Sequence, residues 1–598
     1  MKNILKKKFA PLYFFYQFIG NKVYLVFLFS TLMVFMDSVG LTLFIPLLQI
    51  ADGNMNTVSS DINDNISLLI NTFFGYLGLD VNIPNMLFLI VLLFTLKGIF
   101  FYFSSLYNAY AQQQVALKMR TSLADGIKKL SYKEYVMTDV GRLQNTVLAE
   151  VWQVIVACIQ YLEAIKNVLF VIVYLGFAFF MDWRFSLLVL IGGAITNWIY
   201  KFFYKRTQQL SREITKNNHR YGGIVIEVIN HFKYFKATGR SSFFFGRLQK
   251  ELEDLVSTNM LVAKLNAKLS ALREPMTVVV ICAVIFLHVT VFKSPLSAVM
   301  IILLFFYRVM QKIVDIQTGW NNYLAQTGAV ENMIDFQHYL QRNVDTFYDG
   351  GNMLDNIQSI ELCGLYSSYN EAVVLNDINL KIYKNQSVAF VGESGSGKTT
   401  LVNVITALLP FDSGNFLLNG QSIQSFNIEK YKSKIGYISQ EPTIFNGSIY
   451  DNITFWADRT ELNISKFNEV VNICSLRNFI DELEENEHTL LGNNGLNVSG
   501  GQKQRISIAR ELFRDIEILI MDEATSALDS ETENYIKESL EQLHGKLTII
   551  SIAHRLSTVS SADCIFLLEK GHIVAHGNFL ELKQKSEYFK RLTELQGM

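Results

Sequence analysis

The sequence predicts an α-helical membrane domain of six transmembrane helices with long cytoplasmic extensions, followed by an α/β nucleotide-binding domain of the P-loop class. Hydrophobic residues make up 50% of the chain and aromatic residues 13%, and their excess lies before about residue 318. A glycine-rich loop stands between an apolar strand and an apolar helix at residues 388–400. That context makes a P-loop match specific. At 598 residues the chain is also too long for one ordinary domain.

Charge, hydropathy and cysteine content narrow the class of protein. The formal net charge is −1 and the isoelectric point is about 6.8, so no general electrostatic attraction favours a nucleic-acid partner. The mean hydropathy of +0.22 is high for a soluble protein. The five cysteines are Cys158, Cys282, Cys363, Cys474 and Cys564. They have no C-x-x-C spacing, which predicts apolar positions in a reducing compartment and neither a disulfide framework nor a metal site.

The N-terminal segment, residues 1–20, is predicted to lie on the membrane surface. Four lysines precede an aromatic stretch, and no small-residue cleavage site follows them. This composition is typical of an interfacial amphipathic segment and not of a signal peptide.

Six segments are long and apolar enough, or nearly so, to cross a membrane. They are residues 23–50, 86–106, 158–181, 184–204, 275–292 and 295–315. The first loop, residues 51–85, has four aspartates and neither lysine nor arginine, so it is predicted to face outward. Residues 107–157 and 205–274 are rich in lysine and arginine and are predicted to be helical cytoplasmic extensions. Both termini are therefore expected inside, in a multi-pass protein of the plasma membrane (the bacterial inner membrane).

The predicted division of the chain is an interfacial segment at 1–20, a transmembrane domain at 21–318, a linker at 319–355 and a nucleotide-binding domain at 356–598. A turn-rich run at 348–352 marks the linker. After it, short apolar strands alternate with helical stretches, at 387–391, 435–438, 516–521, 547–552 and 564–568. Such alternation favours a largely parallel sheet.

The loop after Val391 has the pattern G-x-x-x-x-G-K-[ST]. Its expected phosphate-binding residues are Gly392, Glu393, Ser394, Gly395, Ser396, Gly397, Lys398, Thr399 and Thr400. Glycines let backbone N–H groups surround a phosphate, and the helix that follows presents its positive end. Lys398 can reach the terminal phosphates, and the Thr399 hydroxyl can bind magnesium. A nucleoside triphosphate with Mg²⁺ is therefore the predicted ligand.

A second nucleotide element is an apolar strand that ends in two acids, Asp522 and Glu523. Magnesium needs a nearby carboxylate, and hydrolysis needs a base. We predict that Asp522 holds the magnesium and that Glu523 polarises the attacking water.

Residues 498–505, with the sequence VSGGQKQR, stand directly before an apolar helical run. Ser-Gly-Gly at a helix start is itself an anion-binding arrangement. This stretch resembles the signature of ATP-binding cassette (ABC) proteins, with Val498 in place of the usual leucine. The resemblance implies that Ser499, Gly500, Gly501 and Gln502 bind the ATP held by the P-loop of a second cassette. The implied active unit is a head-to-tail pair of cassettes with two ATP molecules between them.

Further positions match the cassette one by one. Tyr369 resembles the aromatic residue that stacks on adenine, Gln440 the glutamine that senses magnesium and the attacking water, and His554 the switch histidine on the γ-phosphate. Residues 526–529 (SALD) resemble the loop that carries signals between the two sites. The predicted catalytic set is thus Lys398, Gln440, Glu523 and His554, and the predicted metal ligands are Thr399, Gln440 and Asp522. Asn493 stands where exporters of this family often have glutamate.

The resemblance covers the whole chain, in the order of an exporter half-transporter of the type IV fold. It implies short coupling helices near residues 132–141 and 230–239. Charged residues within predicted spans are Asp37, Glu163, Lys166, Arg308, Lys312 and Asp315. Such groups are expected to pair with one another or with a polar group of the cargo. Asp37 has no basic neighbour one turn away, and its surroundings resemble the first span of flippases for lipid-linked oligosaccharides, so it is a candidate cargo contact.

The sequence therefore predicts an ATP-hydrolysing transporter that exports or flips an amphipathic, lipid-linked or peptide cargo from the cytoplasmic side. Its expected partners are the lipid bilayer, the cargo and a second half-transporter, with a homodimer favoured over a heterodimer. Two alternatives stay open: an importer with the same fold, and an ATP-gated channel or regulatory subunit.

Overall fold

The structure is a computed structural model that describes residues 13–44, 47, 82–181, 183–290, 296–345, 351–352, 354–369, 372–492, 495–522, 541–552 and 559–595. The chain forms two compact units. One contains residues 1–128 and 137–342, and the other contains residues 129–136 and 343–598.

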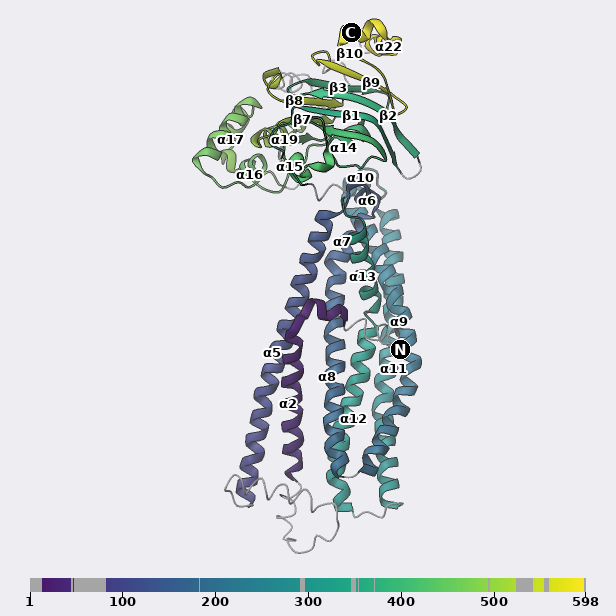
Figure 1. Cartoon of the computed structure of the whole chain (residues 1–598). Coiled ribbons are helices and arrows are strands. Elements are labelled where there is room, and N and C mark those ends of the chain that lie inside the picture. The colour runs from purple at the N-terminus through teal and green to yellow at the C-terminus, as the bar shows by residue number, and fades with distance from the viewer. Residues whose placement is uncertain are drawn as a thin grey trace. The chain divides into compact units, whose positions relative to one another are not determined.

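The first unit consists of long helices (Figure 1). They are α2 (Val23–Thr42), α5 (Ile83–Lys129), α8 (Val151–Met181), α9 (Trp183–Asn230), α11 (Ser241–Thr290), α12 (Leu296–Leu324) and α13 (Thr327–Arg342). Two short helices, α7 (Val140–Asn145) and α10 (Phe232–Ala237), belong to the same unit, whereas residues 132–136 of a third, α6 (Tyr132–Met137), belong to the second unit. α6 and α7 coincide with the first predicted coupling segment, and α10 with the second.

The long helices match the predicted spans and their extensions. Among the described residues, four helical stretches are long and apolar enough to cross a membrane: Tyr13–Thr42, Ile83–Lys129, Gly141–Phe179 and Ser186–Asn230. The fifth and sixth predicted spans lie in α11 and α12. α9 has 48 residues and is therefore about 72 Å long, more than twice the roughly 30 Å hydrocarbon thickness of a bilayer. α9 is therefore long enough to extend beyond the membrane, as the sequence predicts.

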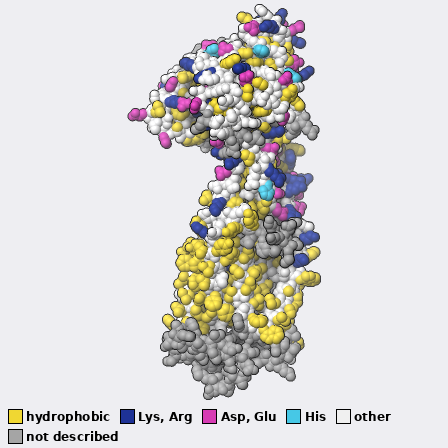
Figure 2. Space-filling view, in the orientation of Figure 1, with side chains coloured by type: hydrophobic (Ala, Val, Ile, Leu, Met, Phe, Trp, Pro, Cys, Tyr) yellow, Lys and Arg dark blue, Asp and Glu magenta, His cyan; other side chains and the backbone are white. Residues whose placement is uncertain are grey.

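Apolar side chains cover the surface of this unit as well as its interior. Figure 2 shows hydrophobic side chains gathered over the long helices. Exposed examples are Phe88 and Val91 on α5, Trp198 and Phe202 on α9, and Phe286 on α11. An exposed apolar surface of this extent is typical of a lipid contact. The interior cluster joins α2, α8 and α12 through Val34, Phe170, Tyr174, Phe305 and Phe306.

The segment predicted as a linker, residues 319–355, is more structured than expected. α12 continues to Leu324, and α13 then runs to Arg342. α13 is helical because Val330, Met333, Phe336 and Leu340 recur at helical spacing and are all buried. The turn predicted at 348–352 lies mostly outside the described residues.

The second unit has two sheets. The six-stranded sheet has the order β10-β9-β3-β8-β7-β6. Its parallel strands are β3 (Ser387–Gly392), β6 (Ile435–Ile438), β7 (Ile518–Asp522), β8 (Thr548–Ile552) and β9 (Cys564–Glu569), and β10 (His572–Gly577) is an antiparallel edge. The other sheet is antiparallel, with the order β2-β1-β4-β5, and consists of β1 (Ser359–Tyr369), β2 (Ala372–Tyr383), β4 (Ser413–Leu418) and β5 (Gln421–Ser422). The predicted α/β fold with a largely parallel sheet is confirmed.

The alternation of side chains along β7 organises the layers of this unit. Ile518 and Ile520 belong to the core that contains α14 (Lys398–Ile405) and the antiparallel sheet. Leu519 and Met521 belong to the core that contains α19 (Gly500–Phe513). Because successive strand residues point to opposite faces, α14 and α19 cover opposite faces of the six-stranded sheet.

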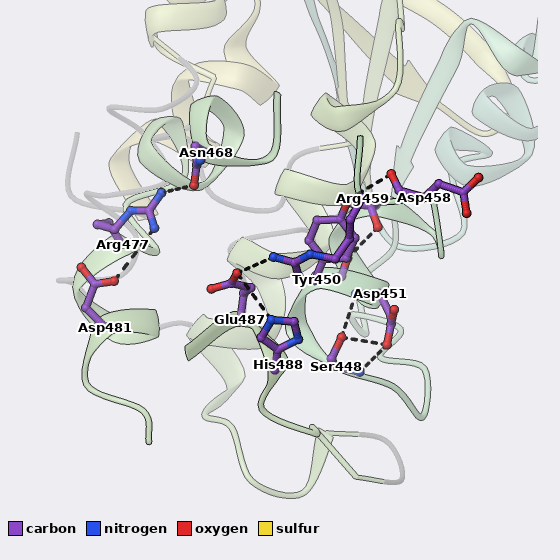
Figure 3. A network of polar contacts seen from close by, with 11 residues as sticks. Ser448, Tyr450, Asp451, Asp458, Arg459, Asn468, Arg477, Asp481, Glu487 and His488 are labelled. Carbon is purple, nitrogen blue, oxygen red and sulfur yellow. Dashed lines mark hydrogen bonds and ion pairs between the residues drawn. The ribbon is translucent and has the colours of Figure 1, made fainter. Parts of the chain in front are cut away.

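α19 belongs to a helical part of the second unit. The other helices of this part are α16 (Ile449–Thr454), α17 (Glu461–Ile473) and α18 (Arg477–Asp481). A polar network ties it together (Figure 3). Arg459 stacks over the Tyr450 ring at 4.5 Å and donates a 2.8 Å hydrogen bond to Glu487. This hydrogen bond lowers the pKa of Glu487. The helices α15 (Ile428–Ser433), α21 (Phe579–Lys585) and α22 (Glu587–Leu595) complete the unit.

Candidate nucleotide-binding site

The predicted P-loop joins the central strand β3 to α14. β3 ends at Gly392 and α14 begins at Lys398. Gly395 and Gly397 have φ angles of +81° and +104°, a conformation that glycine adopts at little cost. The turn therefore places the start of α14, with its unpaired N–H groups, directly after the loop. Glu393, Ser394, Gly395 and Thr399 are exposed, and Thr400 is half-buried.

Two buried side chains of the loop have the chemistry that a phosphate requires. The Lys398 ammonium is 5% exposed, and its Nζ donates hydrogen bonds of 2.8 and 2.9 Å to the carbonyls of Gly392 and Glu393. The Ser396 Oγ is buried and has no hydrogen-bond partner among the described residues. A buried hydroxyl without a partner is costly, and a phosphate oxygen would satisfy it. The loop therefore fits a nucleotide phosphate.

Asp522 ends β7, at the same edge of the sheet as the P-loop. It pairs with Ile552 on β8, which in turn pairs with Phe390 on β3. The Tyr437 hydroxyl on β6 donates a 3.1 Å hydrogen bond to Asp522 Oδ2. Burial and the Asp522 charge raise the pKa of Tyr437, so the phenol stays protonated at neutral pH. Sequence reasoning missed Tyr437, since a tyrosine within a short strand carries no distinguishing pattern.

Gln440 lies two residues beyond β6 and is exposed. Because the carboxyl ends of parallel strands meet at one edge, the P-loop after β3, Asp522 on β7 and Gln440 after β6 share that edge. Glu523 and His554 follow β7 and β8 in the sequence, and both lie outside the described residues. Their catalytic roles stay predictions. The described residues hold no group of three or more His, Cys, Asp or Glu side chains suited to a metal ion.

The signature segment begins α19 as predicted. Ser499 is the N-cap, and its Oγ accepts a hydrogen bond of 3.3 Å from the Gln502 N–H. The Gln502 side chain in turn accepts a 2.8 Å hydrogen bond from the Ser499 N–H. This capping box fixes the helix start. Ser499 and Gly500 are exposed, whereas Gly501 is buried. The serine and the first glycine are thus presented on the surface, where a second chain could reach them.

Arg510 is a further residue that sequence reasoning missed. From α19 its guanidinium donates hydrogen bonds of 2.6 Å to the Asn452 carbonyl, 2.9 Å to Asn452 Oδ1 and 2.7 Å to the Thr443 carbonyl. It also lies over the Phe445 ring at 4.8 Å. Burial lowers the pKa of Arg510. The signature helix is therefore anchored to the segment that follows Gln440. The only signal in the sequence was an arginine between apolar residues of this helix.

Two other predicted positions are described only in part. Tyr369 ends β1 opposite Ala372, but its side chain lies outside the described part of the chain, so stacking on adenine stays a prediction. Val498, the departure from the signature, is half-buried and packs against the core of the helical part. Asn493 and the SALD segment lie outside the described residues.

In the helical unit, Asp37 is buried and paired. Its side chain is 2% exposed, and Oδ1 accepts a 2.6 Å hydrogen bond from Lys97 Nζ on α5. The Tyr174 hydroxyl on α8 donates to Oδ2. The basic partner therefore comes from another helix, and Asp37 joins α2, α5 and α8. Direct contact with cargo stays a prediction. The expected pairing of the other membrane charges is confirmed for Glu163 with Lys166 and for Lys312 with Asp315.

Known proteins resemble both units. The ABC transporter model matches residues 375–526, and the ABC transporter transmembrane region model matches residues 23–314. The heterocyst differentiation ATP-binding protein HepA of Nostoc sp. is 31% identical over 512 residues, covering 84% of this chain and 83% of that protein. The ATP-dependent lipid A-core flippase of Psychrobacter arcticus is 29% identical over 527 residues, covering 84% and 85%. A solved bacterial Atm1-family ABC exporter with ATP bound has a TM-score of 0.79 at 16% identity, covering 97% of this chain and 98% of that chain.

Proposed function

The chain belongs to the ABC transporter family, and from that premise we propose that it acts as a homodimeric flippase or exporter of an amphipathic, lipid-linked molecule. Membership makes it an ATP-binding, ATP-hydrolysing membrane protein that drives transport. The lipid cargo is our inference from the relatives that are described as lipid A-core flippases. Peptide cargo is the alternative within the same class.

One observation carries the proposal. The P-loop, Asp522 and Gln440 follow three parallel strands at one sheet edge, in a chain whose other unit has long helices with an apolar surface. ATP hydrolysis at this edge releases free energy, and the membrane unit of the same chain can couple that free energy to transport.

We assign the chemistry as follows. Lys398 stabilises the charge that develops on the terminal phosphates. Thr399, Asp522 and Gln440 would hold Mg²⁺ when it is bound, since hydroxyl, carboxylate and amide oxygens suit this ion. Glu523 acts as the general base toward water, and His554 contacts the γ-phosphate. Tyr369 stacks on adenine.

The second half of each site comes from a second copy of this chain. The exposed Ser499 and Gly500 at the start of α19 would bind the γ-phosphate held by the partner chain, as a helix N-terminus favours an anion. Both sites of a homodimer then have every predicted residue. ATP binding would close the two cassettes, and hydrolysis would release them.

We propose a multi-pass location in the bacterial inner membrane, with both termini and the cassette on the cytoplasmic side. We also keep the division into residues 1–20, 21–318, 319–355 and 356–598 as a functional proposal. Within it, α13 belongs with the helices.

The test is ATP-driven lipid movement in proteoliposomes whose cassettes face outward. A fluorescent lipid that starts in the outer leaflet should become protected from a membrane-impermeant quencher only when ATP and Mg²⁺ are supplied. The Glu523→Gln variant should bind ATP but lose this protection. ATP-dependent movement from the inner to the outer leaflet would instead indicate an importer. ATP-dependent leakage of a polar dye without lipid movement would indicate a channel.

A further inference from the structure

A polar cavity of about 320 Å³ lies inside the helical unit, between α2, α5, α8 and α12. Its charged lining consists of Glu163 and Lys166 on α8 and Lys312 and Asp315 on α12. Ligand pockets in proteins begin at roughly 300 Å³. The cavity therefore suits the headgroup of an amphiphile and not a whole lipid.

The cavity has polar groups that the protein leaves without partners. The Asn167 side chain lines it, is 7% exposed and makes no hydrogen bond with a described residue. Asn108 donates a 3.1 Å hydrogen bond to Glu163 Oε1, while its own Oδ1 is buried and has no partner in the described part of the chain. Buried amides without partners are costly. A ligand hydroxyl would satisfy Asn167, which lines the cavity, whereas Asn108 lies one turn from the lining residue Ser104 on α5.

The balance of charge favours an anion. The lysines of both ion pairs are partly exposed, at 18% for Lys166 and 27% for Lys312, and each ammonium has three donors. Each pair is also formed within one helix, three residues apart, and such pairs are weak. The lining has two lysines and two carboxylates, and two guanidinium groups outside the lining add positive charge nearby; neither is paired with a described carboxylate. Arg273 donates to Thr318, which lines the cavity, and Arg308 lies one turn from Lys312.

The Asp37 cluster lies one helical turn beyond one end of the cavity. Met33, Phe101 and Phe170 line the cavity, and Asp37, Lys97 and Tyr174 lie four residues, or one turn, from them on the same three helices. α2 and α8 run toward the end of the bundle that carries residues 43 and 181, and α5 runs away from it (Figure 1). On all three helices the step from the lining residue to the cluster therefore runs in the same direction, which places the Asp37–Lys97 ion pair beyond that end of the cavity.

We propose that this cavity binds the anionic, hydroxyl-bearing headgroup of a phospholipid or glycolipid. Lys166 and Lys312 bind the phosphate, and Asn167 binds a hydroxyl group. The acyl chains lie along the apolar surface of the helices. This inference rests on the proposed function, since it identifies the part of the cargo that the membrane unit recognises.

The test measures the binding of lipid probes to the full-length protein in detergent, and ATP hydrolysis serves as a control for an intact nucleotide site. Three probes separate the chemical features: dihexanoyl phosphatidylinositol has both phosphate and ring hydroxyls, dihexanoyl phosphatidylcholine has matched chains but a neutral headgroup without hydroxyls, and octyl glucoside has hydroxyls alone. Binding without nucleotide is measured by native mass spectrometry, which also reports the oligomeric state. The inositol lipid should bind about 10-fold more tightly than the choline lipid, about the contribution of one charge-assisted hydrogen bond.

The variants assign the binding to named residues. Lys166→Gln and Lys312→Gln should each weaken the binding of the inositol lipid about 10-fold, and Lys312→Arg should retain most of it. Asn167→Leu should weaken both the inositol lipid and octyl glucoside. Arg212→Gln is the matched control, since it removes a cation from an exposed interhelical ion pair with Glu331 that does not line the cavity. It should change neither binding nor hydrolysis.

Several outcomes would overturn the proposal. These are equal binding of the choline and inositol lipids, unchanged binding in both lysine variants, and dissociation of a dimer by those variants, which would assign the cavity to a subunit interface. Failure of the proposed function is distinguishable from these. In that case the wild-type protein would bind the inositol lipid in a lysine-dependent way but would move no lipid with ATP.

Discussion

The Tyr437 hydroxyl donates a 3.1 Å hydrogen bond to the carboxylate of Asp522. The two residues lie on the adjacent parallel strands β6 and β7, and Asp522 is the acid that we assign to magnesium. The tyrosine therefore orients a predicted metal ligand without being a ligand itself.

Tyr437→Phe should raise the Mg²⁺ concentration that gives half-maximal ATP hydrolysis by several-fold. A hydrogen bond to a charged group contributes about 1.5–3 kcal/mol of stabilisation. Without the hydroxyl, the Asp522 carboxylate would lose part of the stabilisation that holds it in its orientation. The measurement is a Mg²⁺ titration of ATPase activity at fixed ATP. Tyr431→Phe is the matched control, because the Tyr431 hydroxyl is buried and donates 2.7 Å to the Ile405 carbonyl. An equal Mg²⁺ dependence in both variants would reduce Tyr437 to a packing role.

Lys398→Ala should lower ATP turnover by at least about 100-fold, the loss typical of removing one preorganised charge-stabilising donor. Steady-state phosphate release measures it. Lys430→Ala removes an exposed lysine of α15 and should leave the rate unchanged. Near-normal hydrolysis by Lys398→Ala would mean that the nucleotide site has been assigned to the wrong loop.

Arg510→Lys should destabilise the nucleotide-binding unit by about 2–4 kcal/mol, because lysine keeps the charge but cannot reproduce three directed hydrogen bonds. Denaturant unfolding followed by fluorescence checks this. Arg514→Lys is the comparison on the residue that follows α19, where the arginine pairs with Glu511 and is 40% exposed. Its expected cost is below about 1 kcal/mol. Equal costs for the two substitutions would contradict an anchoring role for Arg510.

Asp37→Asn should destabilise the helical unit by about 3–5 kcal/mol, because it leaves the Lys97 ammonium without its buried partner. Asp37→Leu combined with Lys97→Met should recover most of this loss, since it removes both charges. Thermal unfolding in detergent measures stability, and lipid movement in proteoliposomes measures transport. Retained transport in the double variant would exclude Asp37 as a cargo contact. Loss of transport with recovered stability would support one.

The sequence could predict features that depend on neighbours along the chain. The P-loop follows from a strand, three glycines and Lys398 within 13 residues, 388–400. The capping box of Ser499 and Gln502 likewise needs only three-residue spacing. Strand positions were accurate to within two residues at β7, predicted at 516–521 and found at Ile518–Asp522. The prediction of a linker at 319–355 did not anticipate α13. The apolar residues of α13 are too few to indicate a buried helix until the residues that pack against them are known.

The membrane unit, the P-loop unit and the candidate ATP-binding residues can all be predicted from the sequence alone, because periodicity and motif spacing are local properties. The partners of isolated charges, in contrast, depend on the tertiary structure. Asp37 meets Lys97 and Tyr174 from 60 and 137 residues away, and Arg510 meets Asn452 from 58 residues away. Helix packing and strand order set those contacts, and a lone charge in an apolar segment does not indicate which helix will supply its partner.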